Sequence, residues 1–140
     1  MGRKRNKITG GCLCGTVQFT VSIPIKWCAH CHCTRCRRSH GAGFVTWFGV
    51  NKRNFELKSG NDNLSWYYSS EKSQYGFCIN CGSSIFFKSK KWKNEIHITL
   101  ANLENDHGII PTAHVYFDTH VDWVPTDERL EQFADPKSTD

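Results

Sequence analysis

The chain has 140 residues, of which 39% are hydrophobic and 13% aromatic, a composition that suits one soluble domain around one core. Its first residues pass from basic side chains into glycines and polar groups. They contain neither the apolar core of a secretion signal nor a run near the ~20 apolar residues that span a bilayer. We therefore expect a cytoplasmic protein that makes no contact with membranes.

The net charge of +5 is unevenly distributed along the chain. Residues 1–55 contain ten Lys and Arg and no acidic residue, whereas residues 56–140 contain eight basic and thirteen acidic residues. We expect a flexible basic tail over residues 1–9, a domain over residues 10–135 and a second tail over residues 136–140. The first tail carries only Arg3, Lys4, Arg5 and Lys7. So short a basic run is too weak for strong salt-dependent DNA binding, so nucleic acid is not the expected partner.

The first predicted strand covers residues 16–23, where apolar side chains alternate with polar ones. The apolar side chains are Val17, Phe19, Val21 and Ile23. A helical turn follows over residues 34–39, with Thr34 as its N-cap and Gly41 as its stop. Seven further runs of β-branched or aromatic residues predict strands over 43–50, 55–59, 64–70, 73–78, 83–89, 95–100 and 113–118. The chain is therefore predicted to be mainly β, a single domain of short antiparallel strands.

Eight cysteines stand in a chain with no export signal. In a reducing compartment thiols stay reduced, and metal binding is favoured over a set of disulfides. The spacing of the cysteines divides them into groups. Four of them lie in two short pairs, three lie in one segment, and Cys28 is left over.

The two short pairs together predict a structural zinc site. Cys12 and Cys14 form C-x-C, Cys78 and Cys81 form C-x-x-C, and both pairs adjoin glycines. Tight turns let such pairs converge, and four thiolates complete the tetrahedral set that Zn²⁺ prefers. The metal would hold the first strand against a distant hairpin and so stabilise the fold. The C-x-x-C pair could instead be a thioredoxin-like redox pair, but that motif needs a βαβ setting that this chain lacks.

The remaining segment, Cys31, Cys33 and Cys36, offers three ligands in a C-x-C-x-x-C pattern. A zinc ion with three protein ligands keeps an open position for water or substrate, as catalytic zinc sites do. A second, closed structural site is the alternative, and spacing alone leaves it open. The fourth ligand would then be Cys28, His30, His32 or His40.

Four stretches of the chain resemble a known family: GGCLCGTVQF, CHCTRCRRSHGAGFVTW, FCINCGSSIFF and HVYFDTHVDW. In order and spacing they are similar to the glutathione-dependent formaldehyde-activating enzyme (GFA) family, which also includes centromere protein V. The resemblance runs from Gly10 to Trp123. It implies a tent-like β fold stabilised by two zinc ions. By position, the two short cysteine pairs would be the structural site, and Cys31, Cys33 and Cys36 would hold the catalytic zinc.

The resemblance also implies a carbon–sulfur lyase. Such an enzyme adds a thiol to a small aldehyde, forming S-(hydroxymethyl)glutathione from glutathione and formaldehyde, or cleaves the same bond. Glutathione carries two carboxylates, so Arg35, Arg37 and Arg38 are candidate substrate-binding residues. The aromatic residues expected to wall the pocket are Phe44, Trp47 and Phe48.

Three further residues and one further function complete the predictions. Cys28 is not a ligand in the family pattern, which favours a small buried residue at this position. His32 is expected to point away from the metal or to support a ligand, and His114 to lie in the core or at the pocket edge. The alternative function is a non-catalytic zinc-binding module that recognises a macromolecule through its basic first half.

Overall fold

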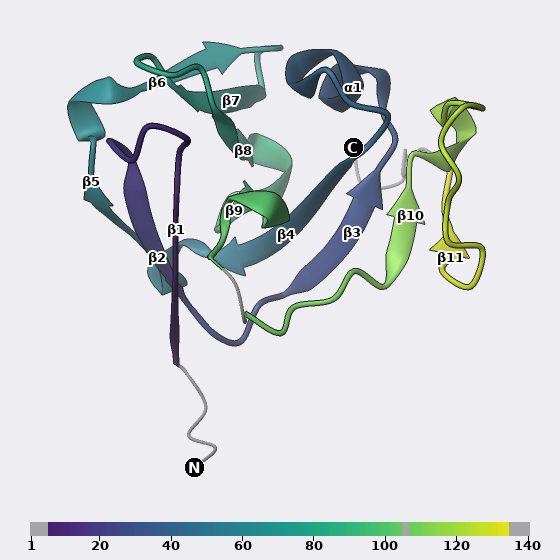
Figure 1. The fold of residues 1–140 in the computed structure, drawn as a ribbon, viewed down its shortest axis with the longest axis horizontal. Helices are drawn as coiled ribbons and strands as arrows, with labels where there is room; N and C mark the ends of the chain where they lie inside the picture. The colour runs from purple at the N-terminus through teal and green to yellow at the C-terminus, as the bar shows by residue number, and fades with distance from the viewer. Residues whose placement is uncertain (1–5, 105–106, 135–140) are drawn as a thin grey trace.

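The structure, a computed structural model, describes residues 6–104 and 107–134. These residues form two β-sheets within one domain, with a short α-helix beside the larger sheet (Figure 1). The smaller sheet is antiparallel and has the strand order β1–β2–β5. Its strands are β1 (Lys7–Gly11), β2 (Gln18–Ser22) and β5 (Phe55–Ser59).

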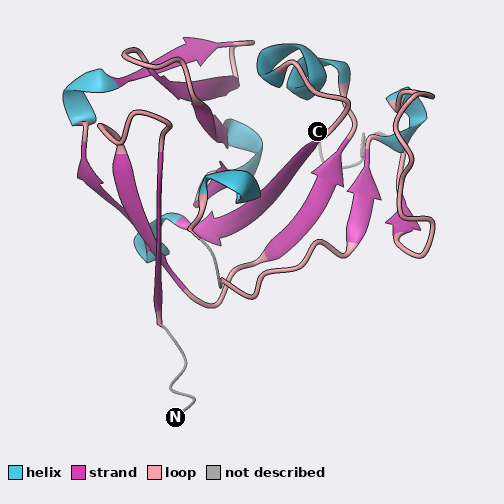
Figure 2. Ribbon diagram, viewed as in Figure 1, coloured by secondary structure: helices cyan, strands magenta, loops and turns pink. Residues whose placement is uncertain are grey.

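The larger sheet has the strand order β11–β10–β3–β4–β9–β8–β7–β6 (Figure 2). Its strands are β3 (Trp27–Cys31), β4 (Val45–Asn51), β6 (Leu64–Tyr68), β7 (Ser73–Cys78), β8 (Ser84–Ser89), β9 (Glu95–Thr99), β10 (Ala113–Val115) and β11 (Glu131–Gln132). The prediction of a mainly β, single-domain fold is confirmed. At one edge, however, β10 pairs in parallel with both β3 and β11, an arrangement that the prediction of antiparallel strands did not include.

The α-helix, α1 (Thr34–His40), directly follows β3. Its N-cap is Cys33 rather than the predicted Thr34, because the Cys33 thiol accepts the hydrogen bond from the backbone N–H of Cys36. Gly41 ends the helix in the left-handed conformation, as predicted, with φ of 59°. Five 3₁₀ turns complete the described elements: η1 (Lys52–Asn54), η2 (Asn61–Asn63), η3 (Lys90–Trp92), η4 (Leu100–Asn102) and η5 (Phe117–Thr119). In the described part of the chain, none of the helices has the length and apolar character needed to span a bilayer.

The main core lies between the two sheets. Phe19 of β2 packs against Phe86 of β8 with ring centroids 5.2 Å apart, and both side chains are almost fully buried. The predicted alternation in the first strand holds for Val17, Phe19 and Val21, all buried, but Ile23 is 38% exposed. This core consists mainly of aliphatic and aromatic side chains from both sheets.

The larger sheet also buries side chains on its other face. Along β4, Phe48 packs into the main core, whereas Val45 and Trp47 belong to a second cluster with Cys31 and Tyr75. Strand side chains alternate between faces, so a strand covered on both sides is apolar throughout. The second cluster, away from the smaller sheet, is where the three-cysteine segment lies.

Three strands were absent from the sequence prediction: β1, β3 and the two-residue β11. β1 contains two glycines, and β3 contains two cysteines and a histidine, so neither has the β-branched composition that marked the others. Because β1 begins at Lys7, the folded domain starts three residues before the predicted boundary at residue 10. Residues 1–5 of the first predicted tail and all of the second lie outside the described residues.

Candidate metal centres and active-site pocket

The structure brings Cys12, Cys14, Cys78 and Cys81 together, a set called here the four-cysteine cluster. Their sulfur atoms all lie within 4.8 Å of one another. The Sγ atom of Cys14 is 3.6 Å from that of Cys12 and 3.8 Å from that of Cys78. Four sulfurs bound at ~2.3 Å to one tetrahedral zinc ion lie ~3.8 Å apart. The four thiols therefore fit one tetrahedral ion.

Although burial raises the pKa of Cys78 to about 11, two other residues of the four-cysteine cluster have hydrogen bonds that favour thiolates. Those with Thr16 and Asn80 lower the pKa of Cys14 to about 7, and those with Ser83 lower the pKa of Cys81 to about 5. The Ser83 hydroxyl also accepts a hydrogen bond of 2.9 Å from the backbone N–H of Leu13. This bond joins the β1–β2 loop to the β7–β8 loop. The cluster thus lies where the smaller sheet meets the larger one.

A second group, the three-cysteine cluster, consists of Cys31, Cys33 and Cys36, whose sulfurs also lie within 4.8 Å of one another. Cys31 ends β3, Cys33 caps α1 and Cys36 lies in its first turn, with the Sγ atoms of Cys31 and Cys36 3.6 Å apart. Hydrogen bonds from the thiols of Cys31 and Cys36 lower the pKa of Cys33, and the same contacts together with burial raise the pKa of Cys31. The group can therefore hold a thiolate, and its three sulfurs could bind a metal ion.

Cys28 lies apart from the three-cysteine cluster. Along β3, Cys31 belongs to the second cluster of buried residues, whereas Cys28 packs into the main core, on the face that Phe48 occupies in β4. Burial raises the pKa of Cys28 to about 11, as expected for a thiol among apolar side chains. Cys28 is therefore not the fourth ligand, and the buried, non-ligand position that the family pattern favoured is the one observed.

Each of the three histidines considered as a fourth ligand has a partner at one ring nitrogen, although His32 Nδ1 and His40 Nε2 have no hydrogen-bond partner among the described residues. His30 Nδ1 lies 2.7 Å from Thr46 Oγ1, and His40 Nδ1 lies 3.1 Å from the Cys36 carbonyl oxygen. His32 Nε2 lies 2.9 Å from His114 Nδ1, and His114 is a buried, hydrogen-bonded core residue. Within residues 6–104 and 107–134, the cluster that could hold an ion here contains three cysteines and no further ligand.

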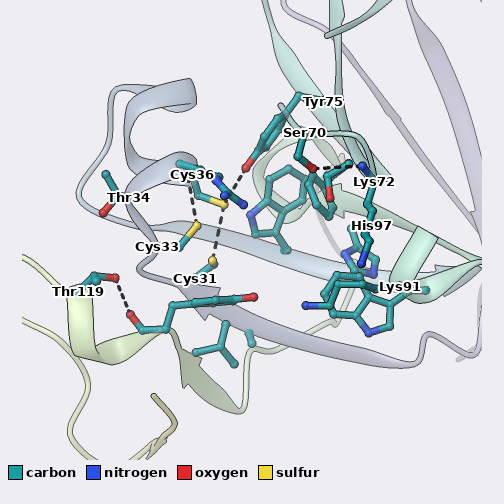
Figure 3. A pocket seen from close by; sticks show the side chains of 18 of the residues that line it. Cys31, Cys33, Thr34, Cys36, Ser70, Lys72, Tyr75, Lys91, His97 and Thr119 are labelled. Carbon is teal, nitrogen blue, oxygen red and sulfur yellow. Dashed lines mark hydrogen bonds between the residues drawn. The ribbon is translucent and has the colours of Figure 1, made fainter. Parts of the chain in front are cut away.

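A pocket of about 750 Å³ opens beside the three-cysteine cluster, whose three side chains lie on one side of it (Figure 3). Six tryptophan, tyrosine and phenylalanine side chains line it: Trp27, Trp47, Tyr75, Phe87, Trp92 and Tyr116. The Tyr75 hydroxyl oxygen is 3.5 Å from Cys36 Sγ, and burial raises the pKa of Tyr75, so this group stays protonated and can donate to a thiolate. Pockets of ~300–1,000 Å³ that are mostly apolar with a few polar groups are typical small-molecule sites.

The predicted substrate-binding residues separate in the structure. Arg35 and Trp47 line the pocket, whereas Arg38 lines an adjoining pocket of about 540 Å³ that shares Arg35 and Tyr75 with the first. Arg37 lines neither, and its Nη1 atom donates a hydrogen bond of 3.1 Å to the carbonyl oxygen of Thr119. Arg37 therefore joins α1 to the segment after β10.

The two other aromatic residues expected in the pocket wall are elsewhere. Phe48 lies in the main core with no exposed surface, because its side chain points to the opposite face of β4 from Trp47. Phe44 packs against the rings of His30 and His32. The expectation that Phe44 and Phe48 wall the pocket is wrong.

Several pocket residues were absent from the sequence prediction. Tyr75, Phe87 and His97 come from β7, β8 and β9, and Lys72 and Trp92 come from the turns beside them. Only the strand order β4–β9–β8–β7 brings these strands beside the cysteine segment. Nothing in their own short stretches of sequence marks them, so no local signal could have identified them.

Residues 7–119 match the family described as glutathione-dependent formaldehyde-activating enzyme. The chain belongs to this family. The match covers both cysteine clusters and all but the last strand, so the resemblance drawn from the four sequence stretches is confirmed.

Two individual relatives share less than 30% of their aligned residues with this chain. An "uncharacterized lyase" of Schizosaccharomyces pombe is 28% identical over 113 residues, which are 81% of this chain and 80% of the relative. A protein of Halomonas elongata, named as a candidate glutathione-dependent formaldehyde-activating enzyme, is 23% identical over 129 residues, 87% of this chain and 82% of the relative. A crystal structure of a Rhodobacter sphaeroides protein, 24% identical, covers 74% of this chain and 97% of its own with a TM-score of 0.60, and supports the fold alone.

Proposed function

We propose that the protein is a zinc-dependent carbon–sulfur lyase, which adds a thiol such as glutathione to a small aldehyde such as formaldehyde, or releases it. The observation that carries the proposal is the difference between the two clusters. The four-cysteine cluster supplies a complete tetrahedral set, whereas the three-cysteine cluster supplies three ligands and opens onto a pocket. Family membership and the lyase name of one relative agree with this chemistry.

In the forward direction the S–H bond of the thiol breaks and a carbon–sulfur bond forms at the carbonyl carbon. The proton is taken up at the carbonyl oxygen, which becomes a hydroxyl, and the reverse reaction returns the thiol and the aldehyde. A zinc ion held by Cys31, Cys33 and Cys36 would supply an open position that acidifies a thiol or polarises a carbonyl oxygen.

The chain's own side chains prepare the pocket for this reaction. The neutral Tyr75 hydroxyl, 3.5 Å from Cys36 Sγ, can donate a hydrogen bond to a negative sulfur or oxygen placed beside it. Trp47 is 4% exposed and packs beside Phe87, so the wall next to the cysteines excludes water. Arg35, at the boundary of the two pockets, offers a cation to a carboxylate of the thiol.

The direct test uses ¹³C-labelled formaldehyde and glutathione. Their adduct also forms without a catalyst, so the quantity to measure is the exchange rate between free and thiol-bound formaldehyde, by NMR, with and without the protein. Exchange faster than the uncatalysed background is expected. We also propose a cytoplasmic location, since a reducing compartment keeps cysteine thiols free to bind metal.

The protein is expected to contain two zinc ions per chain when purified without chelators. Each cluster of sulfurs fits one ion, and thiolates bind Zn²⁺ tightly. Elemental analysis by mass spectrometry, normalised to protein concentration, measures the content. A reproducible value of one zinc ion or none, or a different metal, would contradict this part of the proposal.

Glutathione is expected to bind at least about tenfold more tightly than its analogue with serine in place of cysteine, because a hydroxyl is a harder and less acidic ligand for zinc than a thiol. The two tripeptides have the same charges and nearly the same size, so the comparison isolates the sulfur. Isothermal titration calorimetry of both tripeptides against the zinc-loaded protein measures the difference. Equal affinities would show that the thiol does not reach the metal.

A further inference from the structure

The chain continues beyond the family match as a segment that lies along one edge of the larger sheet. The match ends at residue 119, and residues 120–134, called here the C-terminal segment, contain β11. β11 pairs in parallel with β10, and the backbone N–H of Phe133 donates a hydrogen bond of 2.8 Å to the carbonyl oxygen of His114. The backbone N–H of Phe117 donates one of 2.8 Å to the carbonyl oxygen of Phe133. The C-terminal segment therefore holds β10 on the side away from β3.

β10 and the turn after it bind the backbone of His32, which lies between Cys31 and Cys33. The backbone N–H of His32 donates a hydrogen bond of 3.0 Å to the carbonyl oxygen of Val115. Its carbonyl oxygen accepts one of 3.0 Å from Thr119 Oγ1. The register of the two strands also places Val115 opposite Cys31. The link between two of the three thiols is thus attached on both sides of its peptide group to β10 and η5.

A chain of two further hydrogen bonds joins the side chain of His32 to the C-terminal segment. His32 Nε2 lies 2.9 Å from His114 Nδ1, and His114 Nε2 lies 2.9 Å from the carbonyl oxygen of Asp127. Because a carbonyl oxygen only accepts, the proton of a neutral His114 ring stands on Nε2, and its Nδ1 atom accepts. His32 Nε2 is then the donor. The chain runs from His32 through His114 to Asp127, and it fixes the tautomer of both rings.

Both histidine rings are sealed from water, each with 1% of its surface exposed. The other nitrogen of His32, Nδ1, is buried and has no hydrogen-bond partner among the described residues. The bond to His114 is therefore the one hydrogen bond of the His32 side chain within residues 6–104 and 107–134. Water cannot replace a partner lost at such a depth, so removing the His114 ring nitrogens would leave the His32 ring unattached.

The C-terminal segment also touches the loop that leaves α1. A Cβ atom on Gly43 would lie 2.6 Å from Val124 Cγ2 and 3.2 Å from the Trp123 ring, so the segment packs closely against this glycine. From α1 itself, Arg37 donates its hydrogen bond to the carbonyl oxygen of Thr119. The strand that ends at the first thiol and the helix that carries the last are thus supported by the same edge of the sheet.

We propose that the C-terminal segment positions the three-cysteine cluster, with His114 and His32 as positioning residues that fix the turn between Cys31 and Cys33. Neither ring needs to touch the metal. Their hydrogen bonds hold the backbone so that the three thiols converge, and supporting contacts of this kind typically change metal affinity about 10- to 100-fold. The inference rests on the zinc ion of the proposed function and does not depend on the lyase reaction.

The rate of zinc release tests this role without any substrate. In excess chromogenic chelator the wild-type protein should release its two ions in two phases, and the phase missing from Cys33→Ser belongs to the three-cysteine cluster. His114→Phe keeps a ring of similar size and loses both hydrogen bonds, so it should speed that phase about 10- to 100-fold. The other phase should change less than about twofold, because the β7–β8 loop of the four-cysteine cluster lies toward the opposite edge of the larger sheet.

Three more variants separate the hydrogen-bond chain from general stability. His114→Gln keeps a donor and an acceptor on its amide, so release should return to within about fivefold of wild type. Gly43→Ala pushes against Val124 and leaves both histidines in place, and it should speed the same phase about threefold or more. Ile98→Val is the matched control, because Ile98 is fully buried in the main core, and it should leave both phases within about twofold.

The inference is overturned if His114→Phe leaves the phase of the three-cysteine cluster unchanged, if it speeds both phases alike, or if His114→Gln releases zinc as fast as His114→Phe. A wild-type protein that holds no ion at this cluster would overturn it together with the zinc part of the proposed function. Faster release from His114→Phe, in a protein that binds two zinc ions and has no lyase activity, would count against the proposed function and leave the positioning role supported.

Discussion

Replacing Cys78 with serine should lower the melting temperature of the domain by about 10–20 °C, the largest effect on stability expected of any single cysteine. The four-cysteine cluster joins the loop after β1, in the smaller sheet, to the loop after β7, in the larger one, and Cys12 and Cys78 are far apart in the chain. Holding such distant segments together removes conformational freedom that the unfolded chain would otherwise keep. Because Cys78 has no exposed surface, water cannot easily replace its sulfur at the metal.

The comparison is with Cys33→Ser, which changes the other cluster. Its three ligands come from residues 31–36, a segment already held by the backbone hydrogen bonds of β3 and the cap of α1. Losing one of them should lower the melting temperature by only a few degrees, about 1–2 kcal/mol. Differential scanning calorimetry of both variants, with zinc content measured on the same samples, gives the result. Equal losses of melting temperature would contradict the division into one structural and one catalytic site.

The strands that sequence predicted correctly are those whose composition reflects their burial. β4 is mostly apolar because it has buried side chains on both faces, and β2 alternates because it packs on one. β3 was not predicted because it contains two cysteines and a histidine in place of the β-branched side chains that mark a strand. A strand at β10 was predicted, but its parallel pairing with β3 was not, because the paired residues are more than 80 positions apart and no local pattern acts over that distance.

The grouping of the cysteines could be predicted from their spacing, whereas the residues that line the pocket could not. Residues two or three apart in tight turns can place their thiols close together, so each short pair and the three-cysteine cluster follow from local geometry. The meeting of the two distant pairs was inferred instead from the four ligands that zinc prefers. Tyr75 reaches Cys36 only because β7, β8, β9 and β4 stand in that order in one sheet. The side of β3 on which Cys28 lies would have followed from alternation with Cys31, had the segment been recognised as a strand.

Cys33→Ser should reduce any lyase activity by about 10³-fold, which corresponds to ~4 kcal/mol of transition-state stabilisation and is of the size that loss of a metal contribution causes. Serine is a good N-cap, so this variant keeps the hydrogen bond to the backbone N–H of Cys36 and removes only the thiolate. Cys33→Ala would lose both, at an extra cost of about 1 kcal/mol in stability. Comparing the two separates the cap from the ligand.

The matched control for activity is Cys28→Ala, because Cys28 is a cysteine of the same strand as Cys31 whose side chain lies in the main core. It should keep wild-type turnover and zinc content while losing about 1–2 kcal/mol in stability, since a buried sulfur is removed and a small cavity is left. Rates of carbon–sulfur exchange, measured on folded protein well below each melting temperature, decide between the two positions. If Cys28→Ala abolished exchange and Cys33→Ser did not, the metal would have to sit on the other face of β3, where the structure provides a packed apolar core and no second thiol from that segment.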